Sequence, residues 1–232
     1  MPNLATLLRL ILVTDDAMLA ERDIVAVLRA AVRGGVTAVE LRLKRASPRE
    51  LVALARELVA ALPVPLLIND RLDVALAAGA QGVHLGPGDL PVALARRAAP
   101  SGLVIGASVG LPEEIPRGLG ADYWGVGPWR ASGTKPDAGT PLGAAGFRAI
   151  RARAGTIPCV AIGGILPGDV GDVFRAGGAG VAVGSGILGA RLIEEAASGY
   201  AAALPAGTIS PGGAGPRSPA GDPIPGRDPR KP

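Results

Sequence analysis

Side chains that could bind phosphate groups and a divalent metal recur along this 232-residue sequence, each just after a short apolar run. They are Arg42, Lys44, Asn69, Asp70, Asp89, Ser108, Ser132, Thr134 and Lys135. Cations and hydroxyl groups bind phosphate oxygens, and carboxylates bind a Mg2+ ion that also keeps water ligands. Together these residue types predict a site that neutralises the charge of a phosphorylated small molecule.

Two glycine-rich segments, AIGGI at 161–165 and VGSGI at 183–187, could supply backbone amides to the same site. Glycine lets N–H groups approach an anion closely, and a helix beginning in the second segment would add its dipole. We therefore expect Gly164, Gly184 and Ser185 to contact a phosphate group. The alternative interpretation is that these glycines only permit tight turns.

The two carboxylates of the set also have a structural interpretation. Asp70 could cap the helix that follows it, and Asp89 could cap the next one. However, Asp70 and Asp89 follow adjacent expected strands, so they should converge in space. Convergent carboxylates favour a Mg2+ ion that takes further ligands from a diphosphate.

The cations are interpreted in the same way. Arg42 and Lys44 are two positions apart on an expected strand, so both side chains should leave one face and suit a pyrophosphate. Lys135 lies in a loop at 127–135 that we interpret as a mobile lid over the site. The alternative for Arg42 and Lys44 is a solvated pair beyond the strand end, and the alternative for Lys135 is an ordinary exposed loop lysine. His84 is the only histidine, and we interpret it as a packed strand residue rather than a general base.

These residues can meet only if the elements that carry them form one sheet. Apolar runs predict strands near 8–13, 38–43, 65–68, 82–85, 103–106, 123–126, 159–162 and 180–183. Helical patterns lie near 19–33, 48–61, 71–78, 90–98, 112–119, 141–153, 167–176 and 187–200. This alternation predicts an α/β fold, a single (β/α)8 TIM barrel, whose site lies at the C-terminal ends of the strands. An open doubly wound sheet would show the same periodicity.

Composition argues against several other kinds of protein. The six aromatic residues are too few for a base-stacking surface, so we expect no nucleic-acid partner. No apolar run approaches the roughly 18 residues of a membrane span, and we expect neither a membrane partner nor a signal peptide. A single cysteine, Cys159, is compatible with a reducing cytoplasm. A homo-oligomer is compatible with the sequence.

The C-terminal segment differs from the rest of the chain. Residues 205–232 are rich in Pro and Gly, and they carry four basic and two acidic side chains, half of the formal net charge of +4. Such a segment buries too little apolar surface to offset its ordering entropy. We therefore expect a catalytic barrel domain at 1–204 and a disordered tail at 205–232.

Nine segments, taken in order, resemble those of the thiamine phosphate synthase family. They are LVTD at 12–15, ELRLK at 40–44, INDRLDVAL at 68–76, GVHLGPGDL at 82–90, IGAS at 105–108, ADYWGVGP at 121–128, SGTK at 132–135, VAIGGI at 160–165 and GVAVGSGI at 180–187. Most are weak individually, but the ordered set is specific, and it covers almost the whole expected barrel.

The resemblance implies a transferase that joins hydroxymethylpyrimidine diphosphate to thiazole phosphate and releases pyrophosphate, with Mg2+ assisting ionisation of the pyrimidine C–O bond. By this resemblance, the pyrimidine diphosphate would be held by Arg42, Lys44, Asn69 and Lys135, with Ser108 beside the pyrimidine or the leaving group. The metal would be held by Asp70 and Asp89. The thiazole phosphate would be held by Ser132, Thr134, Gly164, Gly184 and Ser185. The catalytic residues would be Lys135, Ser108 and Arg42.

The sequence also departs from the family pattern. The family usually has glutamine where this chain has Glu40, and a carboxylate close to a diphosphate would repel it unless Lys44 or Mg2+ offsets the charge. Gly110 replaces the usual histidine two residues after Ser108. Ser132 replaces the first threonine of the lid motif, and Trp129 and Arg130 replace the aromatic and small residues before it.

Three alternatives remain beside the synthase. A thiazole tautomerase-like isomerase resembles the family in fold, but it tends to lose the Asn69–Asp70 pair and Lys135 and uses a histidine at the position of Gly110. A diverged, non-catalytic phosphate-binding barrel is suggested by Glu40 and Gly110. Unrelated barrels of tryptophan or histidine synthesis lack the INDR and TK segments. The residues that this chain keeps favour the synthase.

Overall fold

Eight parallel strands form a closed barrel in the computed structural model, which describes residues 3–131 and 139–206. The strands are β1 (Leu10–Val13), β2 (Ala38–Leu41), β3 (Leu66–Asn69), β4 (Gly82–Leu85), β5 (Val104–Ser108), β6 (Tyr123–Val126), β7 (Cys159–Ile162) and β8 (Gly180–Val183). Each strand pairs with the next one along the chain, and β8 pairs with β1. The predicted TIM barrel is therefore confirmed, and the open doubly wound sheet is wrong.

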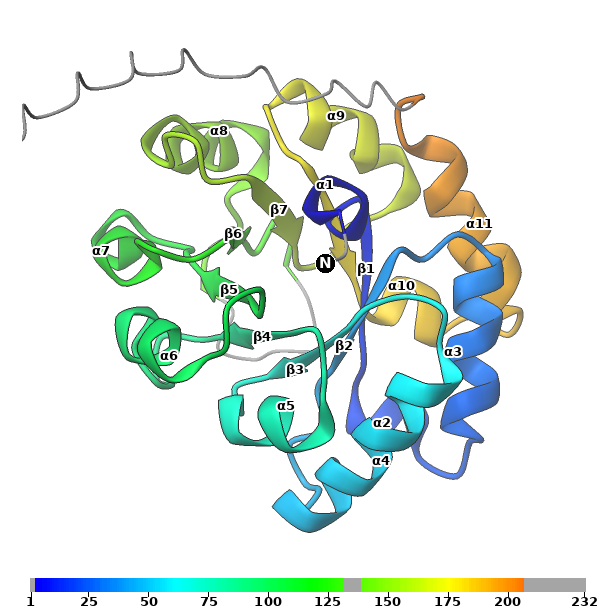
Figure 1. The fold of residues 1–232 in the computed structure, drawn as a ribbon. Coiled ribbons are helices and arrows are strands. Elements are labelled where there is room, and N and C mark those ends of the chain that lie inside the picture. Colours follow the sequence, from blue (N-terminus) through cyan, green and yellow to red (C-terminus); the bar gives the residue numbers. More distant parts are fainter. Residues whose placement is uncertain (1–2, 132–138, 207–232) are drawn as a thin grey trace, which may run out of the picture.

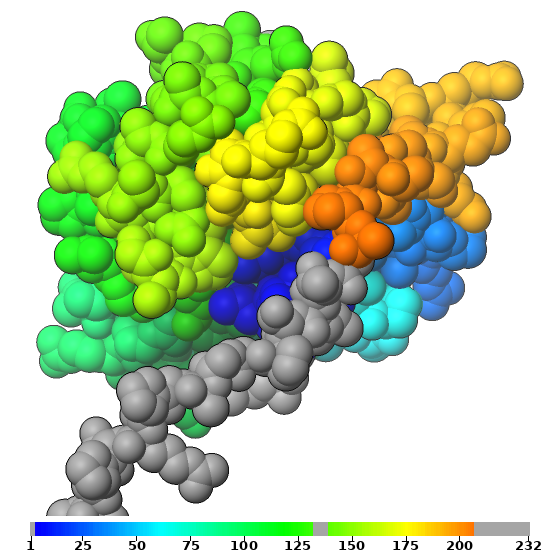
Figure 2. Space-filling view, turned by 90° about the horizontal axis from the view of Figure 1, so that it is seen from above, coloured from blue at the N-terminus to red at the C-terminus, as the bar shows by residue number. Residues whose placement is uncertain are grey.

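Helices surround the barrel (Figure 1). They are α1 (Leu4–Leu7), α2 (Asp16–Leu19), α3 (Ile24–Arg33), α4 (Pro48–Ala61), α5 (Leu72–Ala78), α6 (Val92–Ala98), α7 (Ile115–Gly118), α8 (Gly143–Arg153), α9 (Val170–Arg175), α10 (Ser185–Leu188) and α11 (Ile193–Ala203), with 3-10 turns at Pro112–Glu114 and Pro167–Asp169. The last helix, α11, packs against α3, so the outer layer closes on itself (Figures 1 and 2).

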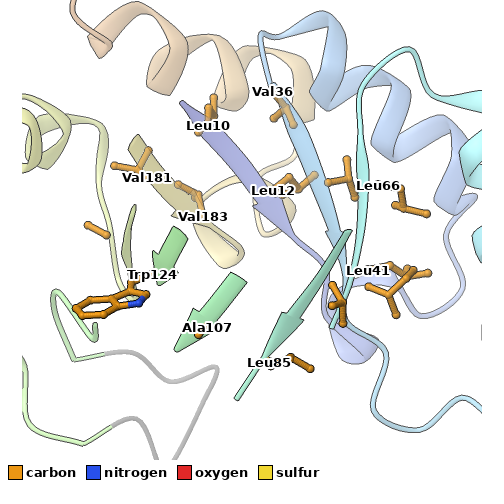
Figure 3. Close-up of a cluster of buried hydrophobic side chains, with 14 of the residues drawn as sticks. Leu10, Leu12, Val36, Leu41, Leu66, Leu85, Ala107, Trp124, Val181 and Val183 are labelled. Atoms are coloured by element: carbon orange, nitrogen blue, oxygen red, sulfur yellow. The ribbon is translucent and has the colours of Figure 1, made fainter. Parts of the chain in front are cut away.

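Alternation along each strand divides the core into two layers, because successive strand side chains point to opposite faces. On β1, Leu10 and Leu12 point outward into a large cluster between the sheet and the helices (Figure 3). Ile11 points inward into a smaller cluster that fills the barrel with Leu67 and Tyr123. The inner cluster also includes Leu7 of α1 and the next residue, Leu8, and α1 lies over one end of the barrel in Figure 1. The barrel is thus packed at its N-terminal end, and its open space lies at the other end.

The structure corrects three predicted element boundaries. The helix expected at 19–33 begins at Ile24, because the Asp23 side chain accepts the Ala26 amide and caps it there. The helix expected at 187–200 is divided into α10 and α11. The second strand ends at Leu41, because the next amides are taken by the segment after β1 rather than by a neighbouring strand.

None of the helices in the described ranges, 3–131 and 139–206, has the length and apolar character needed to cross a membrane.

Candidate active site

Two adjoining cavities open at the C-terminal ends of the strands. The larger has a volume of about 320 Å3 and the smaller about 190 Å3. Both are lined by the same five residues, Arg42, Asn69, His84, Pro87 and Ser108. The predicted residues Arg42, directly after β2, and Asn69 and Ser108, at the ends of β3 and β5, therefore meet at the wall between the two cavities.

The smaller cavity brings the paired carboxylates together with one cation. The ammonium of Lys44 lies 2.9 Å from Oδ2 of Asp70. Oδ2 of Asp89 accepts the backbone N–H of Gly86 at 2.6 Å. Gly86 lies close to both carboxylates. A Cβ built on this glycine would be 3.0 Å from Oδ2 of Asp89 and 3.9 Å from Oδ1 of Asp70. The convergence expected for Asp70 and Asp89 is present.

Neither carboxylate caps a helix. Helix α5 begins after Arg71 without a side-chain cap, and α6 begins after Pro91. Asp70 instead has a left-handed backbone (φ 66°), a conformation that is uncommon outside glycine, asparagine and aspartate and that concentrates at functional sites. Its amide donates to the carbonyl of His84 at 2.8 Å, which holds this turn in place.

The two carboxylates differ in acidity. Burial opposes ionisation of Asp70, but hydrogen bonds with Asp89 and Lys44 and the charge of Lys44 hold its pKa below the usual value. Burial and the hydrogen-bonding contact with Asp70 raise the pKa of Asp89. Two carboxylates that must share one site in this way are stabilised by a bound cation.

The donor set fits Mg2+. Within the residues that the structure describes, no cluster of three or more acidic, histidine or cysteine side chains could hold a metal by itself. Two carboxylates are what Mg2+ uses when it keeps waters and takes its remaining ligands from substrate phosphates. Asp70 and Asp89 therefore suit a metal that arrives with a diphosphate.

Arg42 and Lys44 do not lie on a strand, which corrects the geometric argument that placed them on one face. The Thr14 hydroxyl accepts the Arg42 amide at 2.7 Å, and the Asp16 carboxylate accepts the Lys44 amide at 2.7 Å. The guanidinium of Arg42 lies 3.4 Å from Asp15. The segment after β1 thus positions both cations.

Thr14, Asp15 and Asp16 were missed by the sequence reasoning. The signal was available, because TDD follows β1 as directly as the other polar groups follow their strands. Asp15 and Thr14 also line the larger cavity.

His84 belongs to a buried hydrogen-bonded chain. Its Nδ1 lies 2.9 Å from the Tyr123 hydroxyl and its Nε2 lies 3.0 Å from the Ser108 hydroxyl. Two glycines make room for these rings. A Cβ on Gly106 would lie 2.3 Å from the Tyr123 ring, and a Cβ on Gly125 would lie 2.9 Å from the His84 ring. This placement agrees with a packed rather than basic role for His84.

One tautomer of His84 would orient the Ser108 hydroxyl toward the cavities. Burial, followed by the charges of Glu40 and Asp122, raises the pKa of Tyr123 well above its usual value. Tyr123 therefore stays protonated, and in the His84 tautomer that accepts from the Tyr123 hydroxyl at Nδ1, the imidazole proton lies on Nε2 and faces Ser108. The serine hydroxyl, accepting from His84, is then free to donate into the cavities.

Replacing Tyr123 by phenylalanine should disturb this orientation with little change in packing. We expect kcat to fall by about 3- to 10-fold, which corresponds to the loss of one hydrogen bond. Steady-state kinetics of Tyr123→Phe, Ser108→Ala and the double variant test this. The double variant should be no slower than Ser108→Ala, and a further full-sized loss would contradict an effect through Ser108.

Glu40 faces the larger cavity. Its side chain is buried inside the barrel, and it lines the larger cavity but not the smaller one that holds Lys44, Asp70 and Asp89. Glu40 is therefore separated from the cavity in which the two carboxylates and Lys44 meet.

Gly110 occupies a place that admits no side chain as the loop stands. A Cβ there would lie 2.6 Å from the backbone oxygen of Gly127. The Glu114 carboxylate accepts the amides of Gly110 and Leu111 at 2.7 and 3.1 Å. The loop after β5 is thus built around this glycine.

The glycine-rich segments lie on the opposite side of the larger cavity. Gly163, Gly164, Gly184 and Ser185 line it. Both glycines after β7 have positive φ (91° and 66°), and α10 begins at Ser185 directly after Gly184. Gly164, Gly184 and Ser185, which were expected to contact a phosphate group, therefore lie in the same cavity. Ser132, Thr134 and Lys135 of the expected lid lie outside the described residues.

A closed parallel barrel with cations, paired carboxylates and glycine-rich loops at one end defines a phosphate-binding TIM-barrel enzyme. Comparison with known proteins identifies the family within this class. Residues 10–187 match the model of the thiamine monophosphate synthase family. The chain belongs to this family.

Two curated relatives and one solved structure agree with that assignment. A thiamine-phosphate synthase of Albidiferax ferrireducens is 48% identical over 79% of this chain and 86% of its own length, and one of Chloroflexus aurantiacus is 47% identical over 82% and 89%. A thiamine phosphate pyrophosphorylase from Pyrococcus furiosus is 36% identical, with a TM-score of 0.75 over 87% of this chain and 97% of its own. The expected family and enzyme class, a transferase, are confirmed.

Proposed function

We propose that this protein condenses hydroxymethylpyrimidine diphosphate with thiazole phosphate to form thiamine phosphate and pyrophosphate. The C–O bond between the pyrimidine methylene carbon and the diphosphate breaks, and the thiazole nitrogen bonds to that carbon. The observation that carries the proposal is the pair of adjoining cavities, one with cations and carboxylates and the other with glycine-rich loops, separated by five shared residues.

The smaller cavity is assigned to the diphosphate. Lys44 and Arg42 bind its oxygens, and Asn69 donates its amide to them from the shared wall. Asp70 and Asp89 would hold Mg2+, which when bound supplies positive charge to the leaving diphosphate. These residues act by neutralising and orienting the leaving group, so the bond breaks with less separation of uncompensated charge.

The larger cavity is assigned to the two rings and to the thiazole phosphate. The phosphate meets the backbone amides near Gly164 and Gly184 and the Ser185 hydroxyl, where α10 begins. Ser108, held by His84, lies between the two cavities and can donate to the pyrimidine or to the leaving group. The ionisation itself requires no general base, which agrees with a site whose one histidine is buried in a hydrogen-bonded chain.

The direct test is product formation from both substrates and Mg2+ by the purified protein, with thiamine phosphate measured by fluorescence after oxidation. We expect product that disappears with EDTA and returns with added Mg2+. Folded protein that makes no product would overturn the synthase assignment and favour a tautomerase-like isomerase or a non-catalytic binder.

We assign Lys135 of the family's lid motif to the diphosphate. Lys135→Ala should therefore weaken binding of hydroxymethylpyrimidine diphosphate by about 10-fold or more, because one charge-assisted contact is lost. Binding of thiazole phosphate should change little. Calorimetry with each substrate separately distinguishes the two, and a loss confined to thiazole phosphate would contradict the assignment.

We place the reaction in the cytoplasm. Cys159 is buried and unpaired, as suits a compartment that keeps thiols reduced.

A further inference from the structure

The segment after β6 lies directly against the segment after β7. The amide of Trp129 donates to the carbonyl of Ile162 at 2.8 Å, and the amide of Arg130 donates to the carbonyl of Gly163 at 2.9 Å. These bonds extend the contact between two neighbouring strands beyond the strand ends. The segments at 127–131 and 163–169 are thus held together by backbone contacts.

The glycine pair after β7 is required by this contact. A Cβ on Gly163 would lie 2.8 Å from Cβ of Pro128, and a Cβ on Gly164 would lie 2.8 Å from Cβ of Arg130. Both distances are shorter than real Cβ contacts allow, and both glycines have positive φ. Gly163 and Gly164, which line the larger cavity, therefore also pack directly against residues 128–131.

An ion pair fastens the two segments. The Arg130 guanidinium donates to both oxygens of Asp169, at 2.8 Å from Nε and 2.5 Å from a terminal nitrogen. The Asp169 side chain is only 6% exposed, while that of Arg130 is 53% exposed. Asp169 also accepts the Leu166 amide at 2.9 Å. A planar guanidinium bound at two points fixes direction as well as distance, which a lysine cannot do.

The charge state of the pair is secure. The Arg130 guanidinium holds the pKa of Asp169 below its usual value against the opposing effect of burial, with help from the Leu166 amide. Both partners are therefore charged over the ordinary working range of pH. Arg130 is one of the departures from the family pattern, and neither it nor Asp169 lines either cavity.

We propose that Arg130 and Asp169 are positioning residues that lock the segment after β6 onto the segment after β7 and so hold Gly163 and Gly164 in place for the phosphate of the thiazole substrate. The substrate part of this inference rests on the proposed function. The docking of the two segments does not, since it follows from the contacts themselves.

Calorimetry and kinetics test the substrate part. Arg130→Gln removes the charge, and Arg130→Lys keeps the charge without two-point geometry. Arg175→Gln is the matched control, because Arg175 pairs with Asp172 on the surface of α9. For Arg130→Gln we expect the Kd and KM for thiazole phosphate to rise about 10-fold, as a displaced binding loop would cause. Arg130→Lys should lie between, and the control should match the native protein.

A purely structural role would give a different pattern. It would lower thermal stability and raise the KM of both substrates together. We expect the KM for hydroxymethylpyrimidine diphosphate to rise less than that for thiazole phosphate, because Arg130 and Asp169 do not line the smaller cavity. Equal changes for both substrates, or none for either, would overturn the positioning role.

Hydrogen exchange tests the docking without any activity. In Arg130→Gln the amides of Trp129 and Arg130, and those of residues 163–166, should exchange faster together, while amides of β2 and β3 should not. Unchanged exchange after β7 in an enzyme that still makes thiamine phosphate would overturn the inference and leave the proposed function standing. Faster exchange in Arg130→Gln would support the docking even if the native protein made no product. The missing product would in that case overturn only the proposed function.

Discussion

Asp89→Asn is expected to lower Mg2+-supported kcat/KM by about 100- to 1000-fold, the usual cost of losing one preorganised charge-stabilising group. Asp89 and Asp70 converge over Gly86 at the side of the smaller cavity. A neutral amide at position 89 keeps the shape and the hydrogen bond from Gly86, but it removes half of the negative charge available to the metal. The fold should be retained, because Asp89 caps no helix.

Asp70→Asn should have a similar effect for a second reason. Lys44 lies 2.9 Å from Asp70, so the substitution also releases the cation that we assign to the diphosphate. Asparagine tolerates the left-handed backbone at this position better than most residues, and the turn should survive. The two variants therefore test the charge rather than the conformation.

Asp73→Asn is the matched control, since Asp73 pairs with Arg71 on the surface two residues into α5. Steady-state rates should be measured as a function of Mg2+ concentration, with Mn2+ binding followed by electron paramagnetic resonance. Weaker Mn2+ binding in both site variants and native behaviour of the control are expected. Near-normal turnover in both site variants would remove the metal role.

Local pattern was sufficient to predict the strands and the polar groups that follow them. All eight strands lie where apolar runs predicted them, because parallel strands covered on both faces need continuous apolar sequence. Asp70, Asp89, Asn69 and Ser108 then meet because strand ends meet in a barrel. These predictions needed only the order of elements, which the sequence shows.

Contacts between distant segments were beyond local pattern. The expectation for Arg42 and Lys44 was wrong in its geometry, because Thr14 and Asp16, about one strand–helix unit earlier, take their amides. Asp169 could not be predicted from the sequence as the partner of Arg130. It is 39 residues from Arg130, and neither residue shows periodicity or spacing that refers to the other. Only the closed barrel, which makes β6 and β7 neighbours, brings them together.

At Gly110 the family pattern and the structure lead to different expectations. The family's histidine at this position suggests that restoring it would restore a lost group. The structure indicates the opposite, because the missing Cβ is what lets the loop after β5 approach the backbone oxygen of Gly127. Gly127 is itself confined, since a Cβ there would lie 2.3 Å from the carbonyl oxygen of Ile162. Neither neighbouring segment can move aside easily.

Gly110→His is therefore expected to impair the enzyme. Overpacking against backbone costs about 1–3 kcal/mol, which should lower Tm by about 5 °C in a domain of this size. Because Gly110 lines the larger cavity, the displaced loop and added imidazole should also lower kcat/KM by on the order of 100-fold. Thermal unfolding and steady-state kinetics measure the two effects on the same samples.

Two companion variants separate the Cβ from the imidazole. Gly110→Ala places a Cβ against the same oxygen and should cause most of the loss in Tm. Gly199→Ala, on α11 with no atom within 4 Å of the new Cβ, should leave Tm unchanged or slightly raised. A Gly110→His enzyme with native stability and equal or higher activity would refute this account. It would mean that the loop after β5 can move away from Gly127, and that the glycine is a tolerated loss rather than a requirement of the packing.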